Sequence, residues 1–272
     1  MQAIIIIFFS LLQSISFQTE NYYIIKIKGE IYNETAGKIL QQGDAVKATD
    51  KLTFRQKDAM AMVISDSRGR FTLKYPEEKD NNDNALYVFV KTALVMNKQN
   101  QLSTRAITIS NTVSNLSDYF GADVFNIISD TLQIKLSKKY YPLSEGHDIV
   151  VSYNRNNQEL SRKINEKNQL ITISRTIFDL KSGGEVYIPN VNIYKVNSET
   201  GTKLLISNTD FRFIDQKQLN KEFNTIIDKL YEGNKSEMQN LLTDYFKDVY
   251  GKTDEILLSK YIYELINKHS GG

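Results

Sequence analysis

The spacing of the apolar residues changes once along the chain, and this change constrains the fold more than any other feature. Up to about residue 213, apolar residues occur in short runs that alternate with polar ones, as at Ile25, Ile27 and Ile31. A period of two is typical of half-buried β-strands. From Asp215 onward the period is about 3.6, which is typical of amphipathic helices. The sequence therefore predicts a mainly β chain with a C-terminal α-helical segment.

Glycines punctuate the first strands in the stretch "IKIKGEIYNETAGKILQQGDAVKATDKLTF". Gly29 and Gly43 stand where runs of alternating residues end or begin, and glycine adopts positive φ without steric cost. The carboxylate of Asp44 can bind the backbone of its own turn. Short strands joined by such turns predict a small β-barrel or β-roll.

The order of these turn and strand residues resembles the FecR-type extracytoplasmic β-domain. The resemblance covers about residues 25–73 and rests on strand and turn positions. The matching residues are Gly29, Leu40, Gly43, Asp44, Val46, Leu52, Ala61, Ile64, Gly69 and Leu73. The resemblance implies the fold of this segment and a setting outside the cytoplasm.

The middle of the chain repeats short strands at a regular spacing. Before this region, "NTVSNLSDYFG" reads as a short helix that Gly121 ends. Six candidate strands then follow, namely "LQIKLSKKYYPL", "DIVVSYN", "SRKIN", "QLITISRTIF", "EVYIPNVNIYKV" and "KLLISNTDFRF". Polar turns separate them, so this pattern predicts a β-sandwich of immunoglobulin-like architecture, although the cysteines and tryptophan typical of antibody domains are missing.

Three capped helices are expected at the C-terminal end. Asp215 with Gln218 resembles a capping box for the first helix. Ser236 and Gln239 are placed to start the second helix, and Thr253 to start the third. Each helix carries one apolar face, so the three can form a small bundle or pack on the sandwich.

The first residues resemble a secretory signal. Residues 3–12 are apolar and uncharged, and small residues follow at Ser14 and Ser16, as a signal peptidase requires. The alternative is a buried first strand of a cytosolic protein. The expected organisation is a signal peptide at residues 1–16, a FecR-like β-rich domain at 17–128, an immunoglobulin-like β-sandwich at 129–213 and a helical domain at 214–272. The chain is therefore expected to be exported to the periplasm or cell surface, without membrane insertion once the signal is removed.

Charge and composition argue against several classes of function. The chain has 34 basic and 32 acidic residues, a net charge of +2, and no long basic run. Nucleic-acid binding normally needs a basic face, so no nucleic-acid partner is expected. Cysteine is absent, which excludes disulfides, thiolate nucleophiles and cysteine-bound zinc.

Two motifs could carry chemistry. Asp80, Asn82 and Asn84 are spaced like the start of a calcium loop, but Ala85 and Lys91 replace the glycine and glutamate that such a loop needs, so a solvated loop is expected. His147 lies in a turn beside Glu145 and Asp148, where it could bind a metal or act as a catalytic imidazole. Turns of this kind are more often solvated hairpins. We therefore expect no catalytic residue, no metal and no cofactor.

Tyrosine is abundant, with 16 residues in the chain. Tyrosine offers a large rigid contact area with a polar tip, and it is enriched at protein interfaces as well as in strands and core edges. The candidate partner-binding residues are Tyr140, Tyr141, Tyr245 and Tyr261. The expected function is a non-catalytic binding or scaffold protein of the bacterial cell envelope, whose partner is another envelope protein. The alternative is an exported hydrolase that uses carboxylates or His147.

Overall fold

A computed structural model describes residues 20–65, 69–75, 87–89, 94–96, 112–143 and 146–270. The chain divides into two compact units, Met1–Lys98 and Gln99–Gly272. The expected signal peptide, the calcium-like residues Asp80, Asn82 and Asn84, and Glu145 lie outside the described residues. In the described part, no helix combines the length and the hydropathy that a membrane span requires.

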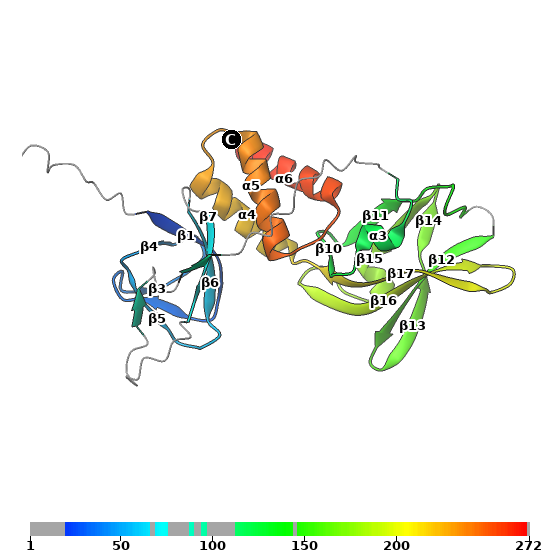
Figure 1. Ribbon diagram of the computed structural model, residues 1–272, viewed down its shortest axis with the longest axis horizontal. Coiled ribbons are helices and arrows are strands. Elements are labelled where there is room, and N and C mark those ends of the chain that lie inside the picture. The colour runs from blue at the N-terminus through cyan, green and yellow to red at the C-terminus, as the bar shows by residue number, and fades with distance from the viewer. Residues whose placement is uncertain are drawn as a thin grey trace, which may run out of the picture. The chain divides into compact units, whose positions relative to one another are not determined.

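The first unit consists of short antiparallel strands in two sheets (Figure 1). One sheet has the order β4-β1-β6-β7-β9 and the other the order β3-β2-β5-β8. The strands are β1 (Asn21–Lys28), β2 (Ile31–Asn33), β3 (Lys38–Ile39), β4 (Ala45–Lys47), β5 (Lys51–Phe54), β6 (Met60–Ser65), β7 (Gly69–Lys74), β8 (Tyr87–Phe89) and β9 (Leu94–Met96). Both sheets contribute to one core, in which Ile24 and Val63 of the first meet Leu52 and Phe54 of the second.

The turn chemistry expected in this unit is confirmed. Gly29 and Gly43 have φ values of 72° and 89°, which favour glycine. A Cβ atom at Gly29 would lie 2.9 Å from that of Ala59, so space as well as conformation requires glycine there. The Asp44 carboxylate accepts a hydrogen bond from the backbone N of Gln41 at 2.8 Å, and the backbone N of Ile24 donates to the Asp44 carbonyl at 2.8 Å.

The second unit contains a β-sandwich. Its five-stranded sheet has the order β10-β17-β16-β12-β13, and its three-stranded sheet the order β11-β15-β14. The strands are β10 (Phe125–Ile127), β11 (Thr131–Lys135), β12 (His147–Arg155), β13 (Gln158–Lys163), β14 (Asn165–Lys167), β15 (Leu170–Ser174), β16 (Val186–Asn197) and β17 (Lys203–Phe213). Ile134 and Ile173 of the small sheet pack in one core with Val151 and Ile193 of the large sheet.

Two short helices accompany the sandwich. The predicted helix before Gly121 is present as α3 (Leu116–Phe120), with Asn115 as its N-cap, and a 3₁₀ turn, η1 (Arg175–Phe178), follows β15. Helix α3 and strand β10 both contribute to the sandwich core, and β10 pairs in parallel with β17. Residues 112–128, which the sequence led us to place in the first domain, therefore lie in the second unit.

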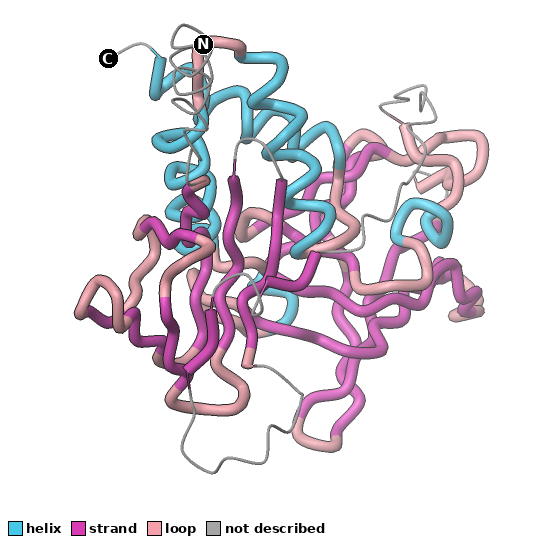
Figure 2. The backbone as a smooth tube through the Cα atoms, turned by 60° about the vertical axis from the view of Figure 1, so that its left-hand side comes forward, coloured by secondary structure: helices cyan, strands magenta, loops and turns pink. Residues whose placement is uncertain are grey.

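Three helices end the chain, and with the sheets they make the fold mainly β with a C-terminal helical segment (Figure 2). They are α4 (Gln216–Leu230), α5 (Lys235–Val249) and α6 (Glu255–Ser270). Asp215 caps α4 as predicted. The start of α5 is capped by Asn234 and not by Ser236. At the start of α6, Asp254 takes the place expected for Thr253, because its carboxylate accepts a hydrogen bond from the backbone N of Leu257.

The segment between α5 and α6 is bonded to the sandwich. The side-chain amide of Asn126, a fully buried residue of β10, donates to the carbonyls of Tyr250 at 2.6 Å and Lys252 at 2.9 Å. The Thr253 hydroxyl donates to the Asn126 carbonyl at 2.6 Å. The Tyr119 hydroxyl also donates to Asp254 at 2.5 Å. These bonds explain why the helices and the sandwich fall in one compact unit.

Candidate functional site

The first pair of predicted partner-binding tyrosines lies between β11 and β12. Tyr140 is 54% exposed, and the Lys139 ammonium lies 5.2 Å from the centre of its ring. Tyr141 is buried, and its hydroxyl accepts a hydrogen bond from the backbone N of Leu116 at 3.0 Å. Tyr140 therefore offers contact area, whereas Tyr141 holds α3 against the sandwich.

The second pair lies in the helices. Tyr245 is fully buried, and its hydroxyl donates to the carboxylate of Glu222, itself buried, at 2.9 Å. Tyr261 is half-buried; its hydroxyl donates to Asn220 at 2.7 Å, and burial raises its pKa to about 12. Tyr245 therefore packs in the core of the helical segment. The sequence pattern could not distinguish these positions, because a helical tyrosine suits a core edge as well as an interface.

The exposed apolar side chains of the described residues gather partly on α6. The exposed large apolar residues are Ile39, Met60, Tyr140, Tyr187, Leu204, Leu205, Ile256, Leu257 and Tyr263. Three of them belong to α6, whereas none belongs to α4 or α5. With about 100° between successive helical residues, Ile256, Leu257 and Tyr263 fall within about 120° of the circumference. We call these three residues the α6 outer face.

The α6 outer face lies opposite the side that packs inward. Leu258, Ile262 and Ile266 are the buried residues of α6. At helical spacing they centre on the far side of the helix from the outer face. Lys260 and Glu264 share the outer side and form an exposed ion pair at 4.0 Å. Exposed aromatic residues are enriched in protein–protein contact surfaces, whereas lysine and glutamate are depleted there, so the tyrosine and the two aliphatic side chains are the contact-forming part of this face.

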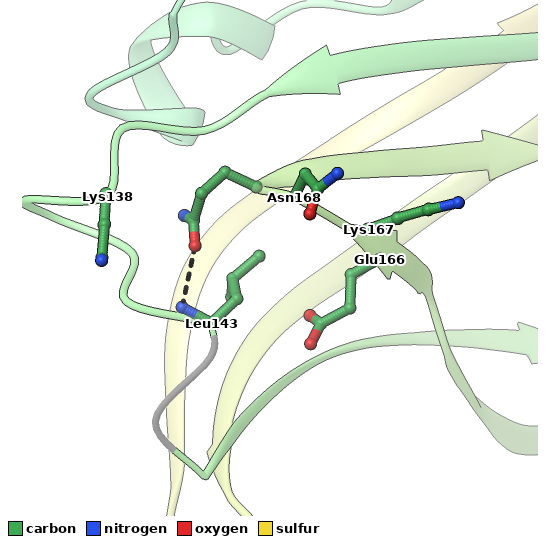
Figure 3. A pocket seen from close by; sticks show the side chains of 6 residues that line it. Lys138, Leu143, Glu166, Lys167 and Asn168 are labelled. Carbon is green, nitrogen blue, oxygen red and sulfur yellow. Dashed lines mark hydrogen bonds between the residues drawn. The ribbon is translucent and has the colours of Figure 1, made fainter.

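A second candidate is a pocket of about 280 Å³ beside the β14–β15 hairpin (Figure 3). Its lining residues are Lys138, Leu143, Glu166, Lys167, Asn168 and Gln169. Gln169 fixes one wall, because its side-chain carbonyl accepts from the N of Leu143 at 3.3 Å and its amide donates to the Tyr141 carbonyl. The hairpin turn at Asn168 and Gln169 has φ values of 53° and 64°.

Glu166 is the chemically distinctive residue of this pocket. One of its carboxylate oxygens is buried without a hydrogen-bond partner in the described structure. Burial raises the pKa of Glu166, the charge of Asp148 raises it further, and Lys163 opposes both. A carboxyl group with a raised pKa can serve as a proton donor or acceptor. No motif in the sequence pointed to Glu166, because its burial and its nearness to Asp148 arise only when the strands pack together.

Two residues of the candidate motif, His147 and Asp148, lie at the start of β12, whereas Glu145 lies outside the described residues. Asp148 pairs with Lys163 at 2.5 Å, and this hydrogen bond lowers the Asp148 pKa. Nδ1 of His147 is buried and has no hydrogen-bond partner there. A catalytic imidazole needs an orienting acceptor and a nucleophile. The part of the chain that the structure covers also contains no cluster of three histidine, aspartate or glutamate residues that could hold a metal.

No protein-family model matches the chain, and none of the curated proteins matches it.

Proposed function

We propose that this chain is a non-catalytic binding or scaffold protein of the bacterial cell envelope, and that it acts through contacts with another envelope protein. The observation that carries the proposal is the α6 outer face. A helix that packs one side inward normally presents polar residues on the other side. Helix α6 instead exposes 41% of Ile256, 38% of Leu257 and 58% of Tyr263.

A partner that covers this face would gain apolar burial and a tyrosine anchor. Tyrosine is among the residues that most often dominate the binding free energy of protein interfaces. Each apolar Å² removed from water contributes roughly 25 cal/mol, so covering these three side chains favours association. The Lys260–Glu264 pair would lie within the contact and supply polar specificity.

Site-specific crosslinking in the producing cell tests this proposal. A photo-reactive phenylalanine analogue at Tyr263 should yield one defined adduct with an envelope protein, identified by mass spectrometry. Tyr263→Glu should abolish association with that protein, because it places a charge in an apolar contact. The control is Asn240→Glu, which makes the same charge change at an exposed position of α5. Equal loss of association in both variants, or no adduct from position 263, would refute the proposal.

The envelope location rests on the apolar run at residues 3–12 and on the FecR-like segment. The mature chain should begin near Phe17 and fractionate outside the cytoplasm. Cell fractionation with amino-terminal sequencing of the recovered protein measures both. An intact Met1 on a cytosolic protein would contradict this part of the proposal alone.

The alternative function is an exported hydrolase that uses carboxylates or His147, and the unpartnered Glu166 oxygen is the observation that favours it. Glu166→Gln keeps the size of the side chain but replaces the carboxyl group with an amide, which cannot act as an acid or a base in catalysis. On the binding-protein proposal, neither this variant nor the double variant His147→Ala, Asp148→Ala should change association with the partner. A hydrolytic activity of the purified chain that disappears in either variant would establish the alternative.

A further inference from the structure

One residue of the β14–β15 turn ties this hairpin to the loop between β11 and β12. The side-chain carbonyl of Gln169 accepts a hydrogen bond from the backbone N of Leu143 at 3.3 Å, and its side-chain amide donates to the Tyr141 carbonyl (Figure 3). The backbone carbonyl of Gln169 accepts a third bond from the N of Leu136 at 2.7 Å. Gln169 has a φ of 64°, a left-handed conformation that glutamine rarely adopts. We call the two side-chain bonds the Gln169 latch.

A carboxyl group lies on the core side of the same hairpin. Glu166 is opposite Ile171 in the β14–β15 ladder, and Ile171 is fully buried in the sandwich core. Residues that lie opposite each other in an antiparallel pair point to the same face, so the Glu166 side chain points toward the core. The neighbouring Lys167 points in a different direction (Figure 3). The buried Glu166 oxygen without a hydrogen-bond partner therefore lies on the inner side of the hairpin.

Ionisation of Glu166 is unfavourable in this position. A buried acceptor that lacks a donor carries the cost of its lost hydration, and this cost is larger for a charged group than for a neutral one. Burial accordingly raises the pKa of Glu166, and the charge of Asp148 raises it further, although Lys163 opposes both effects. The closed hairpin therefore suits the neutral carboxyl group better than the carboxylate.

We propose that Glu166 makes the Gln169 latch sensitive to pH, so that the β14–β15 hairpin holds the β11–β12 loop at acidic pH and releases it toward neutral pH. With Glu166 protonated, its side chain stays on the core side and the latch is intact. Loss of the proton favours movement of the carboxylate into water, which displaces β14 and breaks the latch. The loop carries the exposed Tyr140, so this switch controls how that side chain is presented.

The sign of the effect follows from linkage between protonation and folding. A carboxyl group whose pKa is raised by folding stabilises the folded arrangement below its ordinary pKa, here 4.5, and this contribution is lost as the pH rises through the raised value. Histidine also changes charge between acidic and neutral pH, so the test includes a variant of His147. The charged or titratable groups on the elements around Glu166 are His147 and Asp148 of β12, Lys163 of β13, Lys167 of β14, Lys195 of β16 and Lys138 of the β11–β12 loop.

Hydrogen exchange at the Leu143 amide, measured by NMR on the full chain, reports the state of the latch. Its protection relative to Glu166→Gln at the same pH should fall about tenfold from acidic to neutral pH, and this comparison removes the intrinsic pH dependence of exchange. Glu199→Gln, at an exposed position of the β16–β17 turn, should behave like the unmodified chain. Equal pH dependence in the unmodified chain and in Glu166→Gln would overturn the proposal. So would a dependence that disappears in His147→Gln and persists in Glu166→Gln.

Tryptophan fluorescence supplies the second measurement, because the chain contains no tryptophan of its own. Tyr140→Trp places a single fluorophore on the loop, and its anisotropy should fall from acidic to neutral pH as the loop is released. Adding Gln169→Asn should give the lower anisotropy at both pH values, because asparagine tolerates the left-handed conformation but is one methylene too short to make both bonds of the latch. Anisotropy in Tyr140→Trp that does not change with pH would overturn the proposal. A fall of the same size in the double variant would also overturn it.

Discussion

At the scale of single residues, Asn126 joins parts of the chain that are far apart in sequence. Its side chain is fully buried and bonds two carbonyls in the connection between α5 and α6. A buried polar group without its partner costs about 1–3 kcal/mol. The residue therefore fixes where the helices meet the sandwich.

Asn126→Ala should lower the free energy of unfolding by about 1–3 kcal/mol, because the Tyr250 carbonyl loses its donor. Urea denaturation monitored by circular dichroism measures this. The control Asn224→Ala, at an exposed position of α4, should change stability by less than about 0.5 kcal/mol. A cost as small as that of the control would show that the Asn126 bonds are exchanged for water without loss.

Ionisation of the Tyr261 phenol makes the free energy of unfolding depend on pH in the alkaline range. Burial raises its pKa from 10.0 to about 12 in the folded chain, so folding favours the neutral phenol. The stability that Tyr261 contributes is fully present below pH 10 and is lost as the pH rises through about 12. The difference in unfolding free energy between the native chain and Tyr261→Phe should therefore shift in favour of the phenylalanine variant across this range. A difference that is constant with pH would contradict the assignment.

At the scale of elements, the helix starts show how local chemistry sets boundaries. Asn234 accepts a hydrogen bond from the N of Glu237 at 3.2 Å and so caps α5. The sequence offered Ser236 as an equally good cap, since serine and asparagine have similar cap preferences. At α6, Thr253 is unavailable as a cap because its hydroxyl binds Asn126, and Asp254 takes that role.

Asn234→Ala should destabilise the chain by about 1 kcal/mol, the usual cost of losing an N-cap. Ser236→Ala should have little effect, because Ser236 lies inside the helix. Thermal or urea unfolding of the two variants decides between the two cap positions. A larger loss for Ser236→Ala would place the start of α5 two residues later.

At the scale of the whole molecule, the β-sheets of the first unit and the sandwich of the second unit each have a hydrophobic core of their own. Phe54 is buried in the core of the first unit and Phe178 in the core of the sandwich. A unit with its own core can unfold as a unit. The division of the chain into two units therefore predicts more than one cooperative unfolding transition.

Calorimetry of the full chain should show two unfolding transitions. Phe54→Ala should destabilise one unit and Phe178→Ala the other, each by about 3–5 kcal/mol, because each change leaves a cavity in one core only. Each variant should move one transition and leave the other in place. A single transition that shifts in both variants would instead show that the two units unfold together.

Local pattern in the sequence determined the secondary structure of this protein. Alternation at Leu52 and Phe54 reports a strand with one buried face, and the spacing of Leu219, Phe223 and Ile226 reports a helix, because each pattern depends on neighbours within a few residues. The turns at Gly29 and Gly43 and the cap at Asp215 belong to the same class. These features account for the predicted fold class.

The tertiary structure alone decided which segments meet. The parallel pairing of β10 with β17, and the bond from Asn126 to Tyr250 over 124 residues, assign residues 112–128 and the helices to the same unit as the sandwich. It also decided which tyrosines are exposed and where Glu166 lies. The physical reason is that burial and long-range pairing depend on how whole faces pack together, and no short window of sequence contains that information.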